Sequence, residues 1–276
     1  IIEKNLSCIN YIKTPHDCLP LFNGAQSIKL HQIKKYLENI KSENKNERVG
    51  GLFKIKHKNH FVLIDIDKPP QKKFSKSYQS GPLSFEYYLD GEKIITNSGF
   101  GSHISLKAEL LSRLTACQST LTINETSITK FEKNEMINRV FGNSIQDSFK
   151  SFEVSAINEA EIIGCSASNN GYEKKFGCTH KREIYVDKKN NFLKGSDHIF
   201  KVKDGYPIRY AFRFHVNPGL NVIKTRSGNS ALIQISKNKS LLFTINDETL
   251  DVEKSIFLGE KKIIDSNCIT ISGNLV

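Results

Sequence analysis

The sequence predicts a mainly β protein, a large antiparallel β-sandwich preceded by a short N-terminal helical segment. Apolar and polar residues alternate with a period of two in many short runs after Gly51. Clusters of Asn, Asp and Gly separate these runs at short intervals, whereas helical spacing of apolar residues is clearest near the N-terminus. Many short strands joined by tight turns are typical of a sandwich.

Residues 1–48 are interpreted as a helical segment followed by a linker. A helix is predicted to begin at the N-cap Ser27 and to continue to Ile40, because apolar residues follow helical spacing over this range. The polar run 41–48 ends before Gly50 and Gly51 and is typical of a linker or an exposed loop. The sandwich domain is therefore predicted to span residues 49–276.

The clearest β-hairpin is predicted between Leu83 and Thr96. Asp90 and Gly91 separate two apolar runs there, and this pair favours a two-residue turn. Two strands are expected before the hairpin, at 52–56 and 61–66. Further strands are predicted at 119–123, 152–157, 182–186, 198–202, 208–216, 230–235, 241–245, 255–258 and 268–271.

The composition excludes several classes of protein. The chain has 276 residues, of which 38% are hydrophobic and 25% charged, so it is neither a disordered tail nor a coiled coil. No apolar run approaches the about 18 residues that a membrane span needs, so no membrane partner is expected. The six cysteines form no CxxC pair. This spacing predicts free thiols and keeps a cytoplasmic location as an alternative.

The chain is basic, with 40 Lys and Arg against 29 Asp and Glu, a net charge of +11. Residues 29–76 alone hold 13 basic and 5 acidic residues. Such an excess indicates either an anion-facing surface, for nucleic acid or an acidic polysaccharide, or a solvated lysine-rich surface. No nucleic-acid-binding motif accompanies the charge, so no nucleic-acid partner is expected. The GxSxG, P-loop, HExxH and GxGxxG motifs are absent too, and no cofactor is predicted.

Three segments, 113–123, 170–182 and 210–219, hold the candidate site residues. In the last of them, alternation places Arg213 and His215 on one face of a strand. An arginine and a histidine on the open face of a sheet can bind a carboxylate or a sulfate. The alternative is a polar cross-strand ladder at the rim of the sandwich.

Taken in order, these segments resemble the C-terminal part of the heparinase II/III-like family. The resemblance includes residues 81–86 and 97–99 and covers nearly the whole chain. It implies that residues 49–276 are the β-sandwich that follows an α/α toroid, and that residues 1–48 are the end of this toroid-like domain. A toroid domain of the same protein is thus an implied partner, and the cell envelope or periplasm is the implied location.

The resemblance also implies a polysaccharide lyase that acts on a uronic-acid polymer, such as a glycosaminoglycan, by β-elimination. A base removes the C5 proton, the carboxylate charge is neutralised, and the 4-oxygen leaves with a proton. Tyr and His are the usual base and acid of the family, so His180 and Tyr172 are the catalytic candidates here. The candidates for substrate binding are Arg113, Gln118, Arg182, Arg213 and His215.

Four positions depart from the family pattern. Ser77, Gln79 and Gly81 stand where the pattern HxHxD has its metal ligands, and Gln118 stands at the histidine of an AHNT-like segment. Serine and glutamine are poor zinc ligands, so no metal is predicted at this place. The departures favour an alternative function, a catalytically inactive carbohydrate-binding or scaffolding sandwich.

Overall fold

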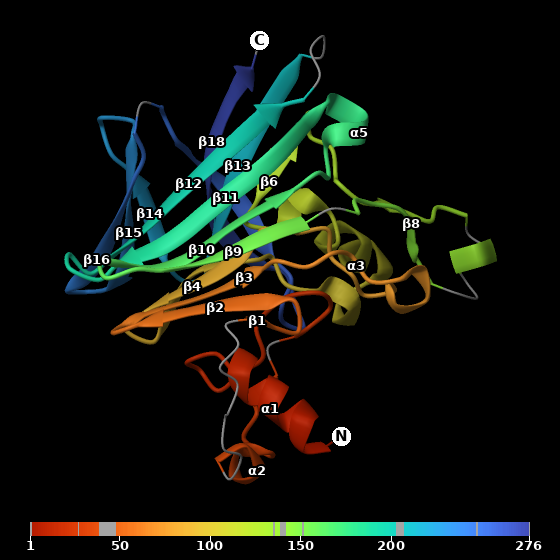
Figure 1. Ribbon diagram of the computed structural model, residues 1–276, viewed down its shortest axis with the longest axis horizontal. Coiled ribbons are helices and arrows are strands. Elements are labelled where there is room, and N and C mark those ends of the chain that lie inside the picture. The colour runs from red at the N-terminus through yellow and green to blue at the C-terminus, as the bar shows by residue number, and fades with distance from the viewer. Residues whose placement is uncertain are drawn as a thin grey trace.

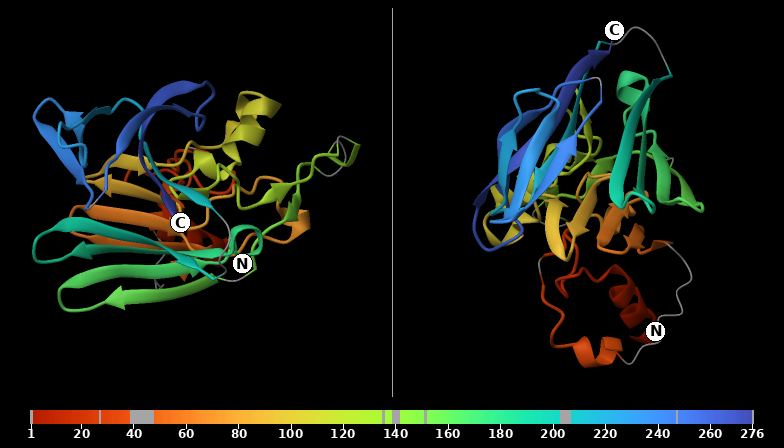
Figure 2. Two further views of the ribbon diagram at one scale, coloured as in Figure 1. Left: turned by 90° about the horizontal axis from the view of Figure 1, so that it is seen from above. Right: turned by 90° about the vertical axis from the view of Figure 1, so that its left-hand side faces the viewer.

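The computed structural model describes residues 2–26, 28–38, 48–134, 136–138, 142–150, 152–202, 207–246 and 248–275. Several antiparallel β-sheets pack around a common core, and the N-terminal helices lie at one end of the molecule (Figures 1 and 2). This architecture confirms the predicted fold class, a mainly β sandwich with a short helical segment. Within the described part of the chain, no helix is long and apolar enough to cross a membrane.

The largest sheet has the order β1-β2-β3-β4-β5-β13-β18-β17, and β6 pairs with β13. Every pair in this sheet is antiparallel. Its strands are Arg48–Val49 (β1), Leu52–His57 (β2), His60–Asp65 (β3), Phe85–Leu89 (β4), Glu92–Thr96 (β5), Leu121–Ile123 (β6), Ile208–Val216 (β13), Asp251–Phe257 (β17) and Ile264–Leu275 (β18).

Two smaller sheets and one ribbon accompany the large sheet among the described residues. The first sheet has the order β12-β11-β10-β9, the second has the order β14-β15-β16, and the ribbon pairs β7 with β8. Their strands are Lys130–Phe131 (β7), Ile145–Asp147 (β8), Phe152–Asn158 (β9), Ile162–Asn169 (β10), Cys178–Asp187 (β11), Phe192–Lys201 (β12), Asn221–Lys224 (β14), Ser230–Ser236 (β15) and Lys239–Thr244 (β16). The helices with described bounds include Ile2–Ile12 (α1), Lys34–Glu38 (α2), Leu106–Ser112 (α3) and Glu173–Phe176 (α5), with 3-10 turns at Lys72–Phe74, Gly101–His103 and Thr115–Cys117.

Strand β13 shows how the alternation of the sequence builds the core. Phe212, Phe214 and Val216 are buried in the hydrophobic core between the sheets. The ring of Phe214 lies 6.1 Å from that of Phe85 and 5.1 Å from that of Phe243, between ring centroids. Each buried aromatic side chain contributes about 1.5–3 kcal/mol by leaving water. The strand has the predicted bounds, 208–216.

The predicted hairpin is confirmed as β4 and β5. Asp90 and Gly91 have φ angles of 53° and 84°. A type I′ turn requires positive φ at both central residues, which glycine adopts without steric cost and aspartate tolerates.

The helix predicted over residues 27–40 is wrong for most of its length. Among its described residues only α2 is helical. Residues 28–30 instead pair with residues 17–19, and the N–H of Leu30 donates to the carbonyl of Asp17 at 2.8 Å. This pairing satisfies backbone groups that a helix would otherwise have used. Helix α1 was not predicted, and Ser27, Ile40 and linker residues 41–47 lie outside the described residues.

The N-terminal segment packs against the outer face of the large sheet. Its side chains Ile12 and Phe22 join a second apolar cluster with residues of β2, β3 and β4. The same outer face continues through β5 to β13, where Thr96 pairs with His215. The segment therefore covers one end of this face, and polar side chains of β13, β18 and β17 occupy the other.

Candidate functional site

Residues 112–121, here called the central segment, run from the end of α3 through the 3-10 turn at Thr115–Cys117 into β6. Most of the central segment is buried. Six of the seven predicted site residues belong to it or donate a hydrogen bond to it, and His180 is linked to it through Asp197 and Arg182. The structure thus brings the predicted residues together around one element. The six are Arg113, Gln118, Tyr172, Arg182, Arg213 and His215.

Arg113 is fully buried and holds three loop carbonyls. Its Nε donates to the Tyr78 carbonyl and its Nη2 to the Ser75 carbonyl, both at 2.8 Å, and its Nη1 donates to the Asn143 carbonyl. The guanidinium also lies 4.0 Å from the ring centroid of Phe131. Burial lowers the pKa of Arg113 to about 10. This geometry favours a role in ordering loops, and the predicted contact with substrate stays a prediction.

The positions that match the family's metal and histidine residues do lie together. Nε2 of Gln79 and Nε2 of Gln118 both donate to the Ser112 carbonyl at 2.8 Å. Nε2 of Gln79 also donates to the Gly99 carbonyl at 3.0 Å, and its Oε1 accepts from the Gly24 N–H at 3.1 Å. We call this arrangement the amide cluster.

The amide cluster does not fit a divalent metal. The two amide nitrogens are donors, and Oε1 of Gln79 already accepts a backbone hydrogen bond, so the cluster presents no convergent set of lone pairs. A Cβ added at Gly81 would lie 2.8 Å from Cγ of Gln118, so the space is also closed. No group of three or more His, Cys, Asp or Glu side chains with metal-binding geometry occurs among the described residues.

Arg182, Asp197 and His180 form a charged cluster inside the sandwich. Nε and Nη2 of Arg182 donate to Oδ1 and Oδ2 of Asp197 at 2.7 and 3.0 Å, and Nη1 donates to the Leu83 and Ser119 carbonyls. Nε2 of His180 lies 2.7 Å from Oδ1 of Asp197. Burial opposes the charge of Asp197, but the guanidinium and the imidazole outweigh it and lower the pKa of this carboxyl.

Neither predicted proton-transfer side chain faces solvent. His180 and Tyr172 are each 1% exposed. Burial lowers the pKa of His180 despite its contact with Asp197, and burial raises the pKa of Tyr172. The Tyr172 hydroxyl donates to the Thr126 carbonyl at 2.8 Å. Both groups are thus held in the interior, and their catalytic role stays a prediction.

Arg213 and His215 lie on the outer face of β13, as the alternation predicted. Across the sheet Arg213 pairs with Thr270, and His215 pairs with Cys268, which pairs in turn with Glu253. We call this surface the outer polar face. Its side chains are Thr122, Arg209, Arg213, His215, Glu253, Ser255, Thr270 and Ser272.

His215 is a buried, neutral member of the outer polar face. Its Nε2 lies 2.9 Å from the Ala116 carbonyl and its Nδ1 lies 3.1 Å from Oγ of Ser255. The carbonyl is only an acceptor, which assigns the ring proton to Nε2 and leaves Nδ1 to accept from the hydroxyl. Burial lowers the pKa of His215 to about 4, and Arg213 acts in the same direction. His215 therefore joins the central segment to β17 without carrying charge at neutral pH.

Two depressions in the outer polar face meet at Arg213 and Glu253. Their volumes are about 380 and about 220 Å³. The first contains Lys254 and Asp265, and the second contains Arg209. Arg213 is half-buried, and its Nη1 donates to Oγ1 of Thr122, which orients the guanidinium between the depressions. Of the predicted site residues, Arg213 is the one that is not buried.

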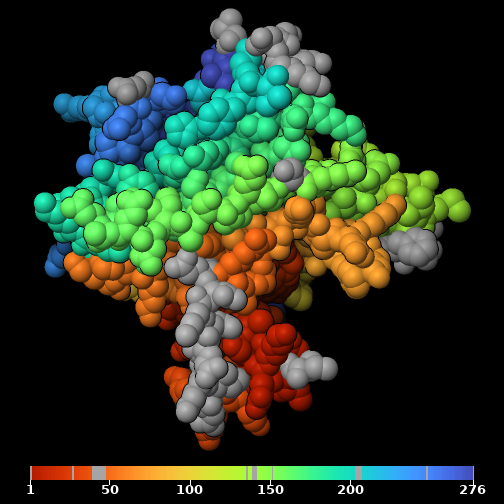
Figure 3. Space-filling model, viewed as in Figure 1, coloured from red at the N-terminus to blue at the C-terminus, as the bar shows by residue number. Residues whose placement is uncertain are grey.

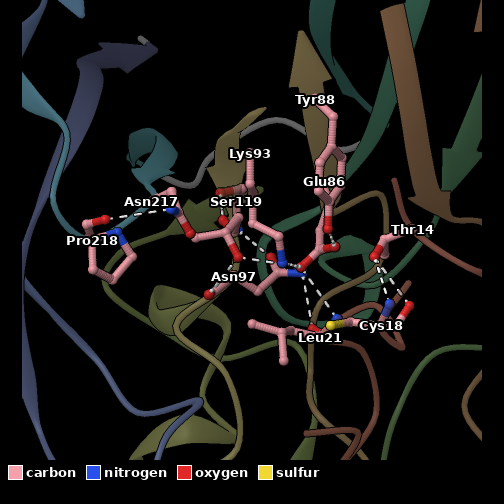
Figure 4. A network of polar contacts seen from close by, with 11 residues as sticks. Thr14, Cys18, Leu21, Glu86, Tyr88, Lys93, Asn97, Ser119, Asn217 and Pro218 are labelled. Carbon is pink, nitrogen blue, oxygen red and sulfur yellow. Dashed lines mark hydrogen bonds and ion pairs between the residues drawn. The ribbon is translucent and has the colours of Figure 1, made fainter. Parts of the chain in front are cut away.

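A buried carboxylate that the sequence analysis missed joins the N-terminal segment to the large sheet (Figure 4). Oε1 of Glu86 accepts from the Leu21 N–H at 3.2 Å and from Nζ of Lys93 at 2.8 Å, and Oε2 accepts from the Tyr88 hydroxyl at 2.9 Å. Asn97 extends the network, because its Oδ1 accepts from the Ser119 N–H at 2.9 Å. The sequence signal that could have identified Glu86 is its position as a glutamate on the outward face of an otherwise apolar strand.

Asp65, at the end of β3, is a second buried carboxyl that was not predicted. Burial raises the pKa of Asp65 to about 7. Its Oδ2 accepts from Nδ2 of Asn23 at 3.5 Å, and its Oδ1 accepts from the Asp67 N–H at 3.3 Å. We therefore expect the contact between Asp65 and Asn23 to depend on pH.

The fold is shared with solved structures of lyases. It is similar to a heparan sulfate lyase from Pedobacter heparinus, with a TM-score of 0.73 at 12% identity, covering 96% of this chain and 42% of that one. It is also similar to heparinase III, with a TM-score of 0.71 at 14% identity, covering 99% of this chain and 46% of that one. The chain thus spans less than half the length of these proteins. No curated protein sequence matches it.

The family is shown by a sequence comparison. The family model described as heparinase II/III-like, C-terminal, matches residues 40–274. The chain therefore belongs to the heparinase II/III-like family and contains its C-terminal domain, which confirms the resemblance seen in the sequence. This membership is consistent with a polysaccharide lyase family. The boundary at residue 49 between helical segment and sandwich stays a prediction.

Proposed function

We propose that this domain binds an acidic polysaccharide on the outer polar face, as the sandwich of a lyase-type protein. The observation that carries the proposal is the position of Arg213 between two depressions of the surface. A guanidinium pairs well with carboxylate and sulfate groups, which are the charged groups of uronic-acid polymers. Glu253 beside it can accept hydrogen bonds from sugar hydroxyls.

Family membership supports a second candidate function, β-elimination on the same polymer. The step moves the C5 proton to a base, breaks the C4–O4 bond, forms the C4–C5 double bond and protonates the departing oxygen. Tyr172 and His180 remain the candidates in this chain, and a toroid domain of the same protein is the other proposed source of base and acid. The burial of both side chains favours the toroid.

The location follows from the proposed polymer. Uronic-acid polysaccharides lie in the cell envelope or outside the cell, so we propose the envelope or periplasm. The six cysteines are free, and free thiols also fit the cytoplasmic alternative.

A binding assay with a matched variant tests the first function. The chain is titrated with heparan sulfate, chondroitin sulfate, hyaluronan and alginate, with neutral dextran as the control polymer. Arg213→Gln is expected to weaken binding to the preferred acidic polymer about tenfold. Arg226→Gln, at an exposed turn position, removes the same charge and is expected to leave the affinity within about twofold. Equal affinities for Arg213→Gln and the wild type would contradict the proposal.

A lyase assay on the full-length protein separates the two functions. Elimination produces an unsaturated uronate that absorbs in the ultraviolet. Product formation would support catalysis, and Tyr172→Phe and His180→Gln would then show whether this chain carries the proton transfers. Binding without product would support the catalytically inactive carbohydrate-binding alternative.

A further inference from the structure

A third pocket lies away from the outer polar face and is larger than either depression there, with a volume of about 580 Å³. One wall is the β7–β8 ribbon with the residues that follow it, to 150, and the other is the turn from β10 into α5, residues 170–175. Figure 3 shows the ribbon region in yellow-green, extending past the β9–β12 sheet in green and cyan. The pocket shares no lining residue with the two depressions.

We propose that this pocket, here called the ribbon pocket, is a second binding site for an acidic sugar. The apolar part of its inner lining is formed by Ile128 and Phe149, which are 9% and 7% exposed, whereas Tyr172 borders the pocket but is only 1% exposed. The Tyr172 hydroxyl donates to the Thr126 carbonyl, so the polar end of this side chain is already paired. An apolar and aromatic lining suits the C–H face of a pyranose ring.

The rim of the ribbon pocket is basic. It carries four lysines, Lys130, Lys150, Lys174 and Lys175, and two carboxylates. Both carboxylates already have partners. Asp147 lies 3.1 Å from Nζ of Lys174, and Oε2 of Glu173 accepts from Nδ2 of Asn170 at 3.1 Å.

The remaining three lysines carry the charge that a ligand would meet. Among the described residues, no carboxylate oxygen lies within 4 Å of the ammonium of Lys130, Lys150 or Lys175, although Lys130 stands opposite Asp147 across the β7–β8 ribbon and attracts it. Nζ of Lys175 lies 5.3 Å from the ring centroid of its neighbour Phe176, a cation–π contact that leaves the ammonium without a carboxylate partner in the part of the chain that the structure describes. Three ammonium groups without a close ion pair among the described residues, around a pocket with apolar lining, match a ligand with a sugar ring and carboxylate or sulfate substituents.

The ribbon pocket is independent of the proposed function at Arg213, because the two sites share no residue. A polymer that engages both sites would gain avidity, whereas a short oligosaccharide reports on each site alone. The probe is therefore a size-defined heparan sulfate hexasaccharide. A neutral cello-oligosaccharide of equal length and inorganic sulfate serve as the two comparison ligands.

The test combines titration calorimetry with a lysine footprint of the wild-type chain. The triple variant K130Q/K150Q/K175Q is expected to bind the hexasaccharide about tenfold more weakly than the wild type. The control triple variant K189Q/K237Q/K261Q loses the same charge at exposed positions and is expected to stay within about twofold. In the footprint, the hexasaccharide should protect Lys130, Lys150 and Lys175 from acetylation.

Each other outcome overturns the proposal. Equal weakening by both triple variants would mean attraction by net charge alone, and equal protection by inorganic sulfate would mean an adventitious ion only. No weakening, no protection, or no binding of the hexasaccharide by the wild type would exclude the pocket. Arg213→Gln is titrated in parallel. Loss of the proposal for the ribbon pocket can then be distinguished from loss of the proposal for the outer polar face. The footprint uses only the wild-type chain, so its result remains valid if the triple variant does not fold.

Discussion

Replacing Arg182 with methionine is expected to lower the free energy of unfolding by about 4 kcal/mol. The guanidinium donates to both carboxylate oxygens of Asp197 and to the carbonyls of Leu83 and Ser119. Methionine retains most of the apolar stem but leaves the carboxylate, which is 14% exposed, without its cation. Removing one member of a buried ion pair costs about 3–5 kcal/mol, and two unpaired carbonyls add to this cost.

Urea unfolding followed by circular dichroism measures the loss. Arg226→Met serves as the control at an exposed position. The double variant R182M/D197N should lose about 2 kcal/mol less than the sum of the single variants, because the two side chains act as a pair. A loss below about 1 kcal/mol for Arg182→Met, together with weaker binding of polysaccharide, would refute the structural interpretation and favour the predicted contact with substrate.

Three further predictions concern protons and metal. Burial raises the pKa of Asp65 to about 7, so the folded chain holds this proton more tightly than the unfolded chain, and the resulting stability is lost as the pH rises through 7. Asp65→Asn should therefore be more stable than the wild type by up to about 4 kcal/mol at about pH 8, and the gain should shrink at about pH 5 in chemical unfolding. Burial lowers the pKa of His215 to about 4, so the unfolded chain is protonated first and stability falls as the pH drops from 6.5 toward 4. His215→Gln should remove about 3 kcal/mol of that decline, and an unchanged pH profile would contradict the assignment. Chelation by EDTA should leave the unfolding temperature unchanged, because Ser77, Gln79 and Gly81 stand at the positions of the family's metal ligands and are poor ligands; a lower unfolding temperature would show a bound metal.

Local sequence patterns predicted the strands in which apolar and polar residues alternate regularly or in which the turn residues are characteristic. Strand β13 alternates without interruption, and Asp90-Gly91 marks the β4–β5 turn. Strand β10 was missed because Gly164 and its serines have low β propensity. It nevertheless forms because β9 and β11 pair along both of its sides. The helix expected after Ser27 failed for a related reason, since residues 17–19 supply a backbone partner that local spacing does not reveal.

The sequence named the candidate residues but not how deeply they are buried, and their functional roles stay predictions. The ordered segments led to residues that do meet around the central segment. Their burial could not be predicted, because an arginine such as Arg113 or Arg182 is stable inside a protein only where carbonyls or a carboxylate converge on it. Those partners come from distant parts of the chain, as Asp197 does for Arg182. Arg213 differs because its strand is open to solvent on the outer side.

The amide cluster has a consequence for the conditions under which the domain keeps its shape. Gln79 ties the loop at Gly24 to the carbonyls of Gly99 and Ser112 through neutral groups. An amide side chain does not titrate near physiological pH, so a change of pH does not break its hydrogen bonds. These hydrogen bonds involve no metal ion, so a chelator does not disturb them. The same junction held by histidines and a metal ion would loosen in acid or under metal starvation. In this chain the hydrogen bonds that join these three segments should persist in acid and under metal starvation.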